Sequence, residues 1–353
     1  MQMRRVAKRA LKFAGYGLAG VLAVAAIALS LTIGWRPVMG SPNARLLTDR
    51  RFEATPARLA RGRYLVEGVA ECFDCHATVE FQGPGQPVRT TRKGSGRIFE
   101  EHGDFRIVAP NITPDRATGA GTWTDDQLAR AIREGVGHDG RALFPIMPYQ
   151  KFREMSDEDL ASVIVYIRSL EPVYNPLPPR RLPFPLSRIV NALPQPVTSS
   201  VTRPTTEDPR KRGEYLVTLA SCGSCHTPGT MEGKPRTDMA FGGGEIFTEA
   251  GYPVASANIT PDASGISYYD EATFIKTLRT GHVGARPLNA PMPWWIFRNM
   301  SDEDLKAIFA YLQTLKPVRH RVDNAETTVR CPVCGNKHGV GGGTEYASRR
   351  TVR

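Results

Sequence analysis

The sequence predicts an all-α protein, in which two tandem copies of one small domain, built from short helices and long loops, follow an N-terminal transmembrane helix. Residues 13–33 form a run of 21 residues without a charge, close to the length of about 20 that spans a bilayer. A series of short motifs then occurs twice in the same order, which indicates an internal repeat. The 28 prolines and 33 glycines favour short helices between loops, and 353 residues suit two modest domains.

Residues 1–35 are predicted to be a signal anchor that crosses the membrane once. Five lysines and arginines within residues 1–12 precede the apolar run, and Trp35 follows it. A secretory signal usually has only about 7 to 15 apolar residues, and the positive-inside rule places the basic N-terminus in the cytoplasm. We therefore expect a single span in the inner (cytoplasmic) membrane and the rest of the chain in the periplasm. A cleaved signal peptide is the alternative.

The repeated motifs define two domains, predicted at residues 55–171 and 210–318. Their order and approximate spacing persist from one copy to the other, so the two domains should share one architecture. The matched motifs are RGRYLVEGVAECFDCH from Arg61 with RGEYLVTLASCGSCH from Arg212, NITPD from Asn111 with NITPD from Asn258, and MSDEDL from Met155 with MSDEDL from Met300.

The segments outside these domains have their own compositions. Residues 172–209 contain ten prolines, which we expect to exclude a helix or a central strand. This segment is predicted to be a semi-rigid linker. Residues 319–353 are rich in glycine and basic residues, and we expect them to form a disordered tail.

Helix-start signals frame each domain. A capping residue followed by proline opens both domains, at Thr55 and at Asp208. A capping box precedes the last amphipathic helix of each copy. The two boxes are Ser156 with Asp159 and Ser301 with Asp304.

The sequence C-x-x-C-H, which occurs once in each domain, indicates covalent haem attachment. Two thiols one helical turn apart can bond the two vinyl groups of one haem, while the adjacent histidine reaches the iron. A redox dithiol or half of a zinc site is the alternative, but a histidine directly follows both cysteine pairs in matched repeats. We therefore predict two covalently bound haem c groups, held by Cys72, Cys75 and His76 and by Cys222, Cys225 and His226.

Two methionines per domain could supply the sixth iron ligand. Met155 and Met300 precede the capping-box serines, where a hydrophobic residue packs onto the fourth residue of the helix. Met147 and Met292 lie beside prolines in extended loops, so we predict these two as axial ligands. The competing histidines do not recur between the repeats; they are His102, His138 and His282. Histidine and methionine ligation raises the reduction potential and is typical of electron carriers.

Other recurring residues allow two interpretations. The NITPD segments at Asn111 and Asn258 indicate local turn chemistry, or loops that bond a haem propionate. Arg133 and Arg279, near predicted helix ends, would be propionate partners or solvated side chains.

A third cysteine pair, Cys331 and Cys334, does not fit the haem motif, because His338 lies four residues after the second cysteine. A disulfide loop or a zinc site, with His320 as a further ligand, is possible for these residues. Their role is left open.

The net charge of +11 does not indicate nucleic-acid binding. Five of these charges precede the apolar run, which leaves a scattered +6 for the rest of the chain. No basic patch is interleaved with stacking aromatic residues.

Residues 111–173 resemble the c-type cytochrome subunits of membrane-bound periplasmic alcohol and gluconate dehydrogenases. The resemblance covers roughly residues 55–320 and implies two tandem class I cytochrome c-like domains. Subunits of that family usually carry three haem modules, whereas this chain has two C-x-x-C-H motifs. The partners it implies are a periplasmic dehydrogenase as electron donor and a membrane or soluble electron acceptor, with electrons passing toward quinone or a terminal oxidase.

We therefore expect a membrane-anchored dihaem electron carrier rather than an enzyme. A dihaem peroxidase or a thiosulfate dehydrogenase is the alternative function. Such an enzyme needs an open or exchangeable iron position, and the sequence offers a methionine for each haem.

Overall fold

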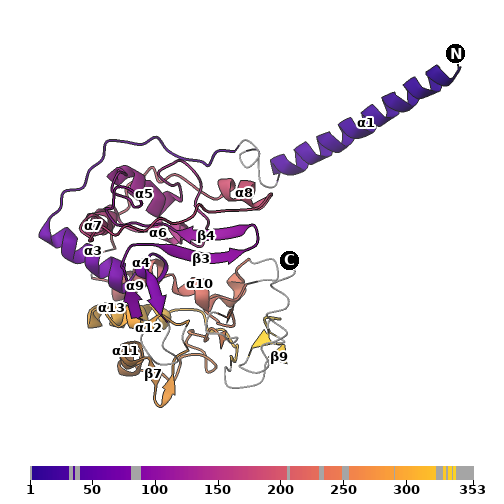
Figure 1. Ribbon diagram of the computed structural model, residues 1–353. Helices are drawn as coiled ribbons and strands as arrows, with labels where there is room; N and C mark the ends of the chain where they lie inside the picture. Colours follow the sequence, from indigo (N-terminus) through magenta and orange to yellow (C-terminus); the bar gives the residue numbers. More distant parts are fainter. Residues whose placement is uncertain are drawn as a thin grey trace.

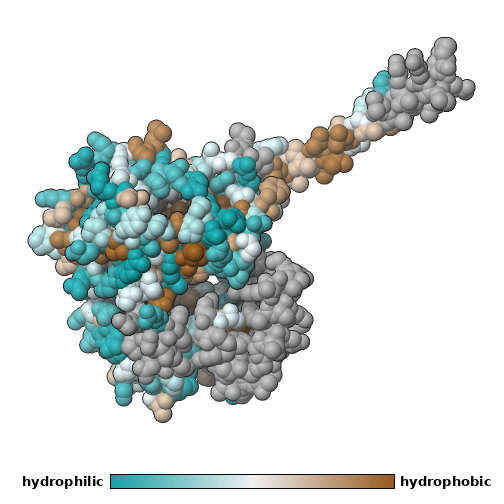
Figure 2. Space-filling model, in the orientation of Figure 1, coloured by the Kyte–Doolittle hydropathy of each residue, from teal (hydrophilic) through white to brown (hydrophobic). Residues whose placement is uncertain are grey.

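One long helix, α1 (Gln2–Leu31), extends away from the rest of the chain (Figure 1). Its segment Lys12–Leu31 is long and apolar enough to cross a membrane, and none of it is buried against the protein. Figure 2 shows this hydrophobic stretch exposed along the helix. The computed structural model describes residues 2–31, 35, 40–80, 89–204, 207–229, 234–248, 254–289, 291–322, 329–330, 333–335 and 337–338.

Two helical domains follow, and among the described residues each has five α-helices in the same order. This arrangement confirms the predicted all-α class and its short helices. Domain 1 contains α3 (Pro56–Gly68), α4 (Cys72–Cys75), α5 (Asp125–Glu134), α6 (Tyr149–Phe152) and α7 (Asp157–Arg168); domain 2 contains α9 (Pro209–Leu219), α10 (Cys222–His226), α11 (Glu271–Thr280), α12 (Trp294–Phe297) and α13 (Asp302–Leu312).

The first and last helices of each domain pack directly against each other. A Cβ atom on Gly62 of α3 would lie 1.9 Å from the carbonyl oxygen of Ser162, and one on Gly213 of α9 would lie 1.9 Å from that of Ala307. Glycine is unfavourable inside a helix by about 1 kcal/mol relative to alanine. Its presence here is explained by a backbone approach that no side chain could permit.

The predicted helix starts are confirmed in part. The Ser156 and Ser301 side chains accept hydrogen bonds from the third residue of their helices. The second hydrogen bond of each predicted capping box, from the N-cap backbone to the side chain of Asp159 or Asp304, is wrong. These two carboxylates instead accept hydrogen bonds from tyrosine and arginine side chains of other helices. The complete box forms instead at Thr124.

The described residues also form five two-stranded antiparallel pairs of strands, four between helices and one after the last helix, and the sequence did not predict them. The longest is β3–β4, which contains an irregularity between Ile98 and Glu100. The short strands lack the long alternating pattern that reveals a strand in a sequence. The hairpins are β1 (Thr78–Glu80) with β2 (Arg89–Thr91), β3 (Arg97–His102) with β4 (Phe105–Ala109), β5 (Ile246–Phe247) with β6 (Val254–Ala255), β7 (His282–Val283) with β8 (Arg286–Pro287), and β9 (Val329–Arg330) with β10 (Lys337–His338).

The proline-rich linker contains a helical segment, so the prediction that proline excludes a helix there is wrong. Helix α8 (Leu186–Ile189) continues into the 3-10 helix η1 (Val190–Ala192). Pro185 precedes the first turn of α8, where a missing N–H has no consequence. The linker is also paired to domain 1 by two backbone hydrogen bonds between Arg106 and Arg181 of 2.7 and 2.9 Å.

Domain 2 extends past its predicted end at residue 318. His320 is only 1% exposed, and its Nδ1 lies 2.8 Å from the carbonyl oxygen of Gly242. The prediction of a disordered tail is therefore wrong for residues 319–322. Cys331 and residues 339–353 lie outside the described residues.

The two domains contact each other through aligned residues: a tyrosine of each domain is hydrogen-bonded to the start of the last helix of the other domain. Tyr215 of domain 2 accepts a hydrogen bond from the Ser156 backbone and donates one of 2.8 Å to Asp159. At the aligned position of domain 1, Tyr64 accepts from the Ser301 backbone and donates to Asp304. We call these two tyrosine contacts the reciprocal clasp. Figure 1 shows domain 1 lying between α1 and domain 2.

Candidate haem sites

Each C-x-x-C-H motif begins a short helix that follows a left-handed residue. Glu71 and Ser221, directly before Cys72 and Cys222, both have φ of 52°. This backbone region is unfavourable for a residue with a side chain, and it concentrates at functional sites. It turns the chain sharply into α4 and α10. The two cysteines of each motif then lie one helical turn apart, as the predicted attachment to one haem requires.

The histidine of each motif is buried and held by a backbone carbonyl. His76 Nδ1 lies 2.8 Å from the oxygen of Pro110, and His226 Nδ1 lies 2.7 Å from that of Ala257. Because a carbonyl can only accept, Nδ1 carries the proton, and Nε2 is left as the nitrogen available to a metal. Burial lowers the pKa of both imidazoles, so they are neutral as a ligand must be.

The NITPD turns hold those two carbonyls in position. Asn111 Oδ1 accepts hydrogen bonds from the backbone and hydroxyl of Thr113, and Asn111 Nδ2 donates to the carbonyl of Val173 at 2.7 Å. Asn258 makes the same bonds to Thr260 and Val318. The interpretation as local turn chemistry is confirmed. Each turn thereby fixes the carbonyl of the residue just before it, and this carbonyl orients the histidine ring.

A glycine that is hydrogen-bonded to the backbone of each histidine lets the chain pass close to the NITPD turn. Gly96 N donates to the His76 carbonyl at 3.0 Å, and Gly243 N donates to that of His226 at 2.8 Å. Their φ values are 74° and 70°, and a Cβ on either would lie 2.4 Å from a backbone atom of the NITPD region. Only glycine fits this position in both domains.

The two methionine pairs differ in burial as their predicted roles require. Met155 and Met300 are 0% and 2% exposed and lie in the core with Leu160 and Leu305. Met147 and Met292 are only partly buried and lie in the turns before α6 and α12. Their assignment as iron ligands stays a prediction.

The thiols do not resemble those of a redox dithiol. Burial raises the pKa of Cys72, Cys75 and Cys222 to about 12, whereas reactive redox cysteines have lowered values. Within the part of the chain that the structure describes, no group of three histidine, cysteine or acidic side chains could hold a metal ion. The raised pKa of these three thiols disfavours the redox interpretation of the motifs.

Buried polar atoms in domain 1 fit a polar group at the first motif. Arg97 Nε and Tyr149 Oη are buried without a hydrogen-bond partner in the described structure. Arg97 Nη2 donates to the Asp74 carbonyl inside the first motif at 2.9 Å, and Tyr149 is two residues from Met147. Burial raises the pKa of Tyr149 to about 12. A haem carries two carboxylates, and donors of this kind are what those carboxylates need. Sequence reasoning missed both residues, since neither recurs in the second repeat.

Each of the two recurring arginines forms an ion pair with an aspartate of the last helix. Arg133 donates to Asp157 at 2.5 Å, and Arg279 donates to Asp302 at 2.6 Å. In each domain the arginine joins the end of one helix to the first residue of the last helix. The interpretation as free, solvated side chains is therefore wrong, whereas the interpretation as propionate partners stays a prediction.

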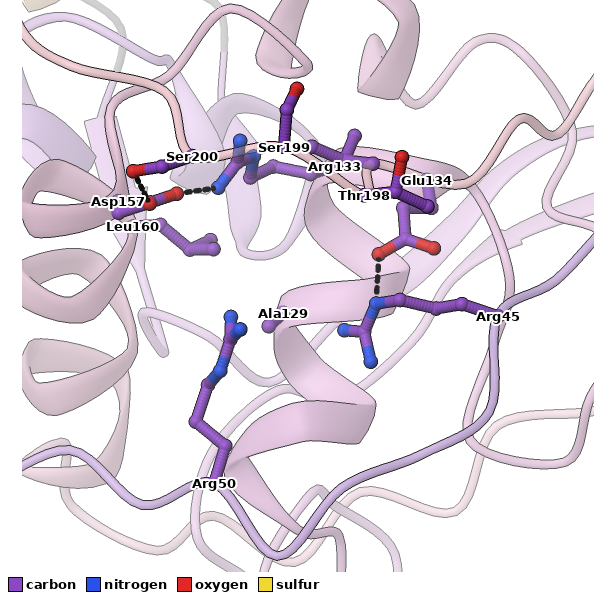
Figure 3. A pocket seen from close by; sticks show the side chains of 11 residues that line it. Arg45, Arg50, Ala129, Arg133, Glu134, Asp157, Leu160, Thr198, Ser199 and Ser200 are labelled. Carbon is purple, nitrogen blue, oxygen red and sulfur yellow. Dashed lines mark hydrogen bonds and ion pairs between the residues drawn. The ribbon is translucent and has the colours of Figure 1, made fainter.

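A cavity of about 180 Å³ beside Arg133 is polar and distinct from the haem sites (Figure 3). Arg45 and Arg50 approach it from the N-terminal segment, and Ser200 approaches it from the linker. Arg45 donates to Glu134 at 2.7 Å and to Asp126 at 2.6 Å. None of the predicted haem residues lines this cavity. The ion pairs of Arg45 fasten the N-terminal segment to domain 1, and the hydrogen bond from Ser200 to Asp157 fastens the linker.

The histidines considered as competing ligands lie elsewhere. His138 stacks on Trp123 with ring centroids 4.1 Å apart, and His102 is 74% exposed. His282 lies in β7, with its Nδ1 2.9 Å from the carbonyl oxygen of Thr280. Of the residues suggested for a zinc site, Cys334 and His338 are described, whereas Cys331 is not.

Each half of the chain thus has the construction of a covalent haem-attachment domain. The chain belongs to the cytochrome c family, which matches residues 59–171 and 211–316. This family supports haem c as the cofactor and electron transfer as its chemistry.

Several curated proteins are similar over most of this chain. It is 31% identical to the fructose dehydrogenase cytochrome subunit of Gluconobacter japonicus over 279 residues, which are 74% of this chain and 54% of that protein. It is 29% identical to the gluconate 2-dehydrogenase cytochrome c subunit of Pantoea cypripedii, over 79% of this chain and 64% of that protein. It is 28% identical to a diheme cytochrome c-type protein of Cereibacter sphaeroides, over 86% and 97%.

The chain spans less than two thirds of the length of the first two of these relatives, but nearly the whole length of the diheme protein. The resemblance to cytochrome subunits of dehydrogenases is confirmed at the level of the family.

Proposed function

We propose that this protein is a membrane-anchored dihaem cytochrome c that relays electrons between a periplasmic dehydrogenase and an acceptor. Each haem is held by the cysteines and histidine of one motif and by one methionine. The ligand sets are Cys72, Cys75, His76 and Met147, and Cys222, Cys225, His226 and Met292. The observation that carries the proposal is that both histidines are buried, neutral and turned by a carbonyl so that Nε2 is left for a metal.

Haem iron supplies one-electron chemistry when bound. The protein's own part is to hold the ligands and limit solvent access. Pro110 and Ala257 fix the histidine tautomer through their carbonyls. Cys72 of the first motif and Cys222 of the second both pack against one hydrophobic core that the two domains share. The two attachment motifs are therefore joined through a continuous core.

The proximity of the motifs supports an electron relay within the chain. The reciprocal clasp joins the domains through hydrogen bonds in both directions, so their separation is not set by the linker alone. A fixed separation between two redox sites favours a constant rate of electron exchange.

The identity of the donor is proposed from the relatives. The similar proteins include cytochrome subunits named for fructose, gluconate and alcohol dehydrogenases. We infer a dehydrogenase as the donor, and quinone or a terminal oxidase as the destination of the electrons. Helix α1 supports attachment to the inner membrane, and the basic residues in its N-terminal part support a periplasmic position for both domains.

Single cysteine substitutions test the two-haem proposal. We expect Cys72→Ser and Cys222→Ser each to remove one covalent haem while the other domain keeps its own, because each domain has a separate ligand set. Haem staining together with intact-protein mass would count the attached groups. Cys334→Ser, outside both motifs, is the matched control and should keep both haems. Loss of both haems from one substitution, or of none, would contradict the proposal.

A further inference from the structure

The linker exposes an apolar patch near the C-terminal end of helix α1. Phe184 is 83% exposed and Ile189 is 39% exposed, although both lie in a segment that is otherwise fastened to domain 1. Pro183 and Pro185 flank Phe184 and are exposed as well. We call residues 183–189 the linker patch. Large exposed hydrophobic side chains gathered in one segment usually mark an interaction site.

Chain length places the linker patch near the bilayer. A Cβ built on Gly40 would lie 3.0 Å from Arg188 Nη1, so the segment that follows the membrane helix touches α8. Eight residues lie between Leu31 and Gly40, and the nine Cα-to-Cα steps that join them reach at most about 30 Å in an extended chain. The patch must therefore lie within about this distance of the end of α1, whatever the angle of the helix. Figure 1 shows α8 beside that end.

Domain 1 presents the patch from a fixed support. The backbone of Arg181 pairs with that of Arg106 in β4, and Arg180 Nη1 donates to the carbonyl of Ala142 at 2.6 Å. On the other side of the patch, Val190 is 1% exposed. The exposed residues are thus held outward by a segment that is anchored at both ends.

The composition of the patch matches the boundary between lipid headgroups and acyl chains. Arg181 precedes the linker patch and Arg188 lies within it, and both arginines are exposed. Aromatic and apolar residues next to cations are typical of segments that lie in the membrane interface, where the cations meet anionic headgroups. Asp104 on the tip of the β3–β4 hairpin lies 3.7 Å from Arg181 and offsets part of its charge. Apolar insertion therefore carries more of the attraction than charge does.

We propose that the linker patch is a second membrane contact, which enters the interface of the same bilayer that α1 spans. This inference rests on the proposed membrane anchor. Two points of attachment hold domain 1 against the membrane in one orientation, with domain 2 on the side away from it (Figure 1). Domain 1 is then the domain nearer to a membrane-bound partner, and domain 2 is the one open to a periplasmic partner.

Spin labels on the full-length protein test this contact. The haem-loaded chain, with Cys331→Ser and Cys334→Ser, would carry one label at Phe184→Cys or at Ile189→Cys. It would be reconstituted in vesicles of phosphatidylethanolamine and phosphatidylglycerol. Collision with oxygen and with a water-soluble nickel reagent gives the depth of each label. We expect both labels about 5–10 Å inside the interface, and a control label at Tyr268→Cys, which is 64% exposed in domain 2, in water.

Two outcomes separate this inference from the proposed function. If the protein floats with the vesicles and the patch labels are as accessible to nickel as the control, the anchor stands and the second contact is wrong. If the protein does not float with vesicles, the anchor is wrong and the inference falls with it. Adding Phe184→Ser to the Ile189→Cys chain should move that label toward water, because Phe184 supplies most of the inserted surface.

Discussion

The two domains share one backbone frame but differ in the charges around the haem motifs. Both turn the histidine with a carbonyl, both need a glycine beside it, and both bury the methionine before the last helix. Beside the first motif, however, Arg97 follows the glycine that contacts His76. In domain 2 the corresponding residue is Gly244, followed by Glu245, whose carboxylate accepts from Gly229 N at 2.9 Å. The two domains thus have the same ligand geometry. They differ in the charged side chains beside the motifs, such as Arg97, and therefore in the electrostatics of the two sites.

The comparison also explains which residues can change. A position is the same in both copies where a backbone atom lies too close for any variation, as at Gly62 and Gly213. It differs where a side chain acts on its surroundings only through charge, as at Arg97. The shared positions should be equally sensitive in the two domains, and the differing ones should produce unequal effects.

The largest expected effect is on folding, from Gly62→Ala or Gly213→Ala. A methyl group at either site would overlap a carbonyl oxygen of the facing helix at 1.9 Å. We expect each change to lower the free energy of unfolding by about 3 kcal/mol or more. Thermal unfolding followed by circular dichroism would measure this loss.

Gly68→Ala in the same helix is the matched control. Its Cβ would lie 3.6 Å from the nearest atom, an ordinary contact, so stability should change little or rise. Equal destabilisation at Gly62 and Gly68 would show that helix propensity, not the close crossing, requires glycine.

Next in size is the effect of the axial methionines on the haem potentials. We expect Met147→Ala and Met292→Ala each to lower one potential by on the order of 0.1–0.3 V, because axial ligands set haem potentials over a wide range. Each should also abolish one methionine-to-iron charge-transfer band. Spectroelectrochemistry of the purified protein would report both quantities.

Met155→Ala and Met300→Ala serve as controls, because these side chains are buried in the core. They should destabilise their domain by about 2–5 kcal/mol and leave both bands in place. Loss of a charge-transfer band from Met155→Ala would show that Met155, and not Met147, is the axial ligand in domain 1.

The reciprocal clasp should be stronger at Asp159 than at Asp304. Asp159 is fully buried, and burial alone would raise its pKa; the hydrogen bond and charge of Arg61, with help from Tyr215 and Arg203, outweigh this and lower the pKa. A carboxyl whose pKa is lowered by folding stabilises the folded state above its unfolded pKa of about 3.9, and this stabilisation is lost as the pH falls below that value.

We expect Asp159→Asn to lower the free energy of unfolding at pH 7 by about 3 kcal/mol, since it leaves the partly buried Arg61 without its main charge partner. It should also remove part of the acid sensitivity of the wild type below pH 4. Denaturant unfolding across pH 3 to 7 would measure both effects, with Asp304→Asn as the matched change in the other half of the clasp. Identical pH profiles for wild type and Asp159→Asn would exclude this role.

The smallest expected effect separates the two domains most directly. Arg97→Gln should lower the potential of the first haem by on the order of tens of millivolts and leave the second unchanged, because a nearby cation favours the less positive, reduced iron. Arg97→Lys keeps the charge and should restore most of the potential. A redox titration that resolves the two haems would detect the difference, and an equal shift of both potentials would argue against a local action of Arg97.

Local chemistry made much of the site predictable from the residues. The cysteines of each motif must be one helical turn apart, the histidine must follow directly, and Ser156 and Ser301 begin helices by bonding within one turn. All of these contacts lie within a few residues along the chain. The methionines were separated by the same reasoning, since the position before a helix cap explains Met155 and Met300 but not Met147 and Met292.

The sequence by itself therefore determined two similar helical domains, their haem motifs and the apolar segment before them, because periodicity, capping and motif spacing are local properties. Only the tertiary structure decided that Arg133 and Arg279 join helices, that Asp159 and Asp304 leave their capping boxes, and that the linker holds a helix at the foot of α1. Tyr64 and Asp304 are 240 residues apart, and the pattern around either residue contains no sign of the other. Such contacts arise only when packing brings whole domains together, because the energy of a buried hydrogen bond depends on neighbours that the local sequence does not specify.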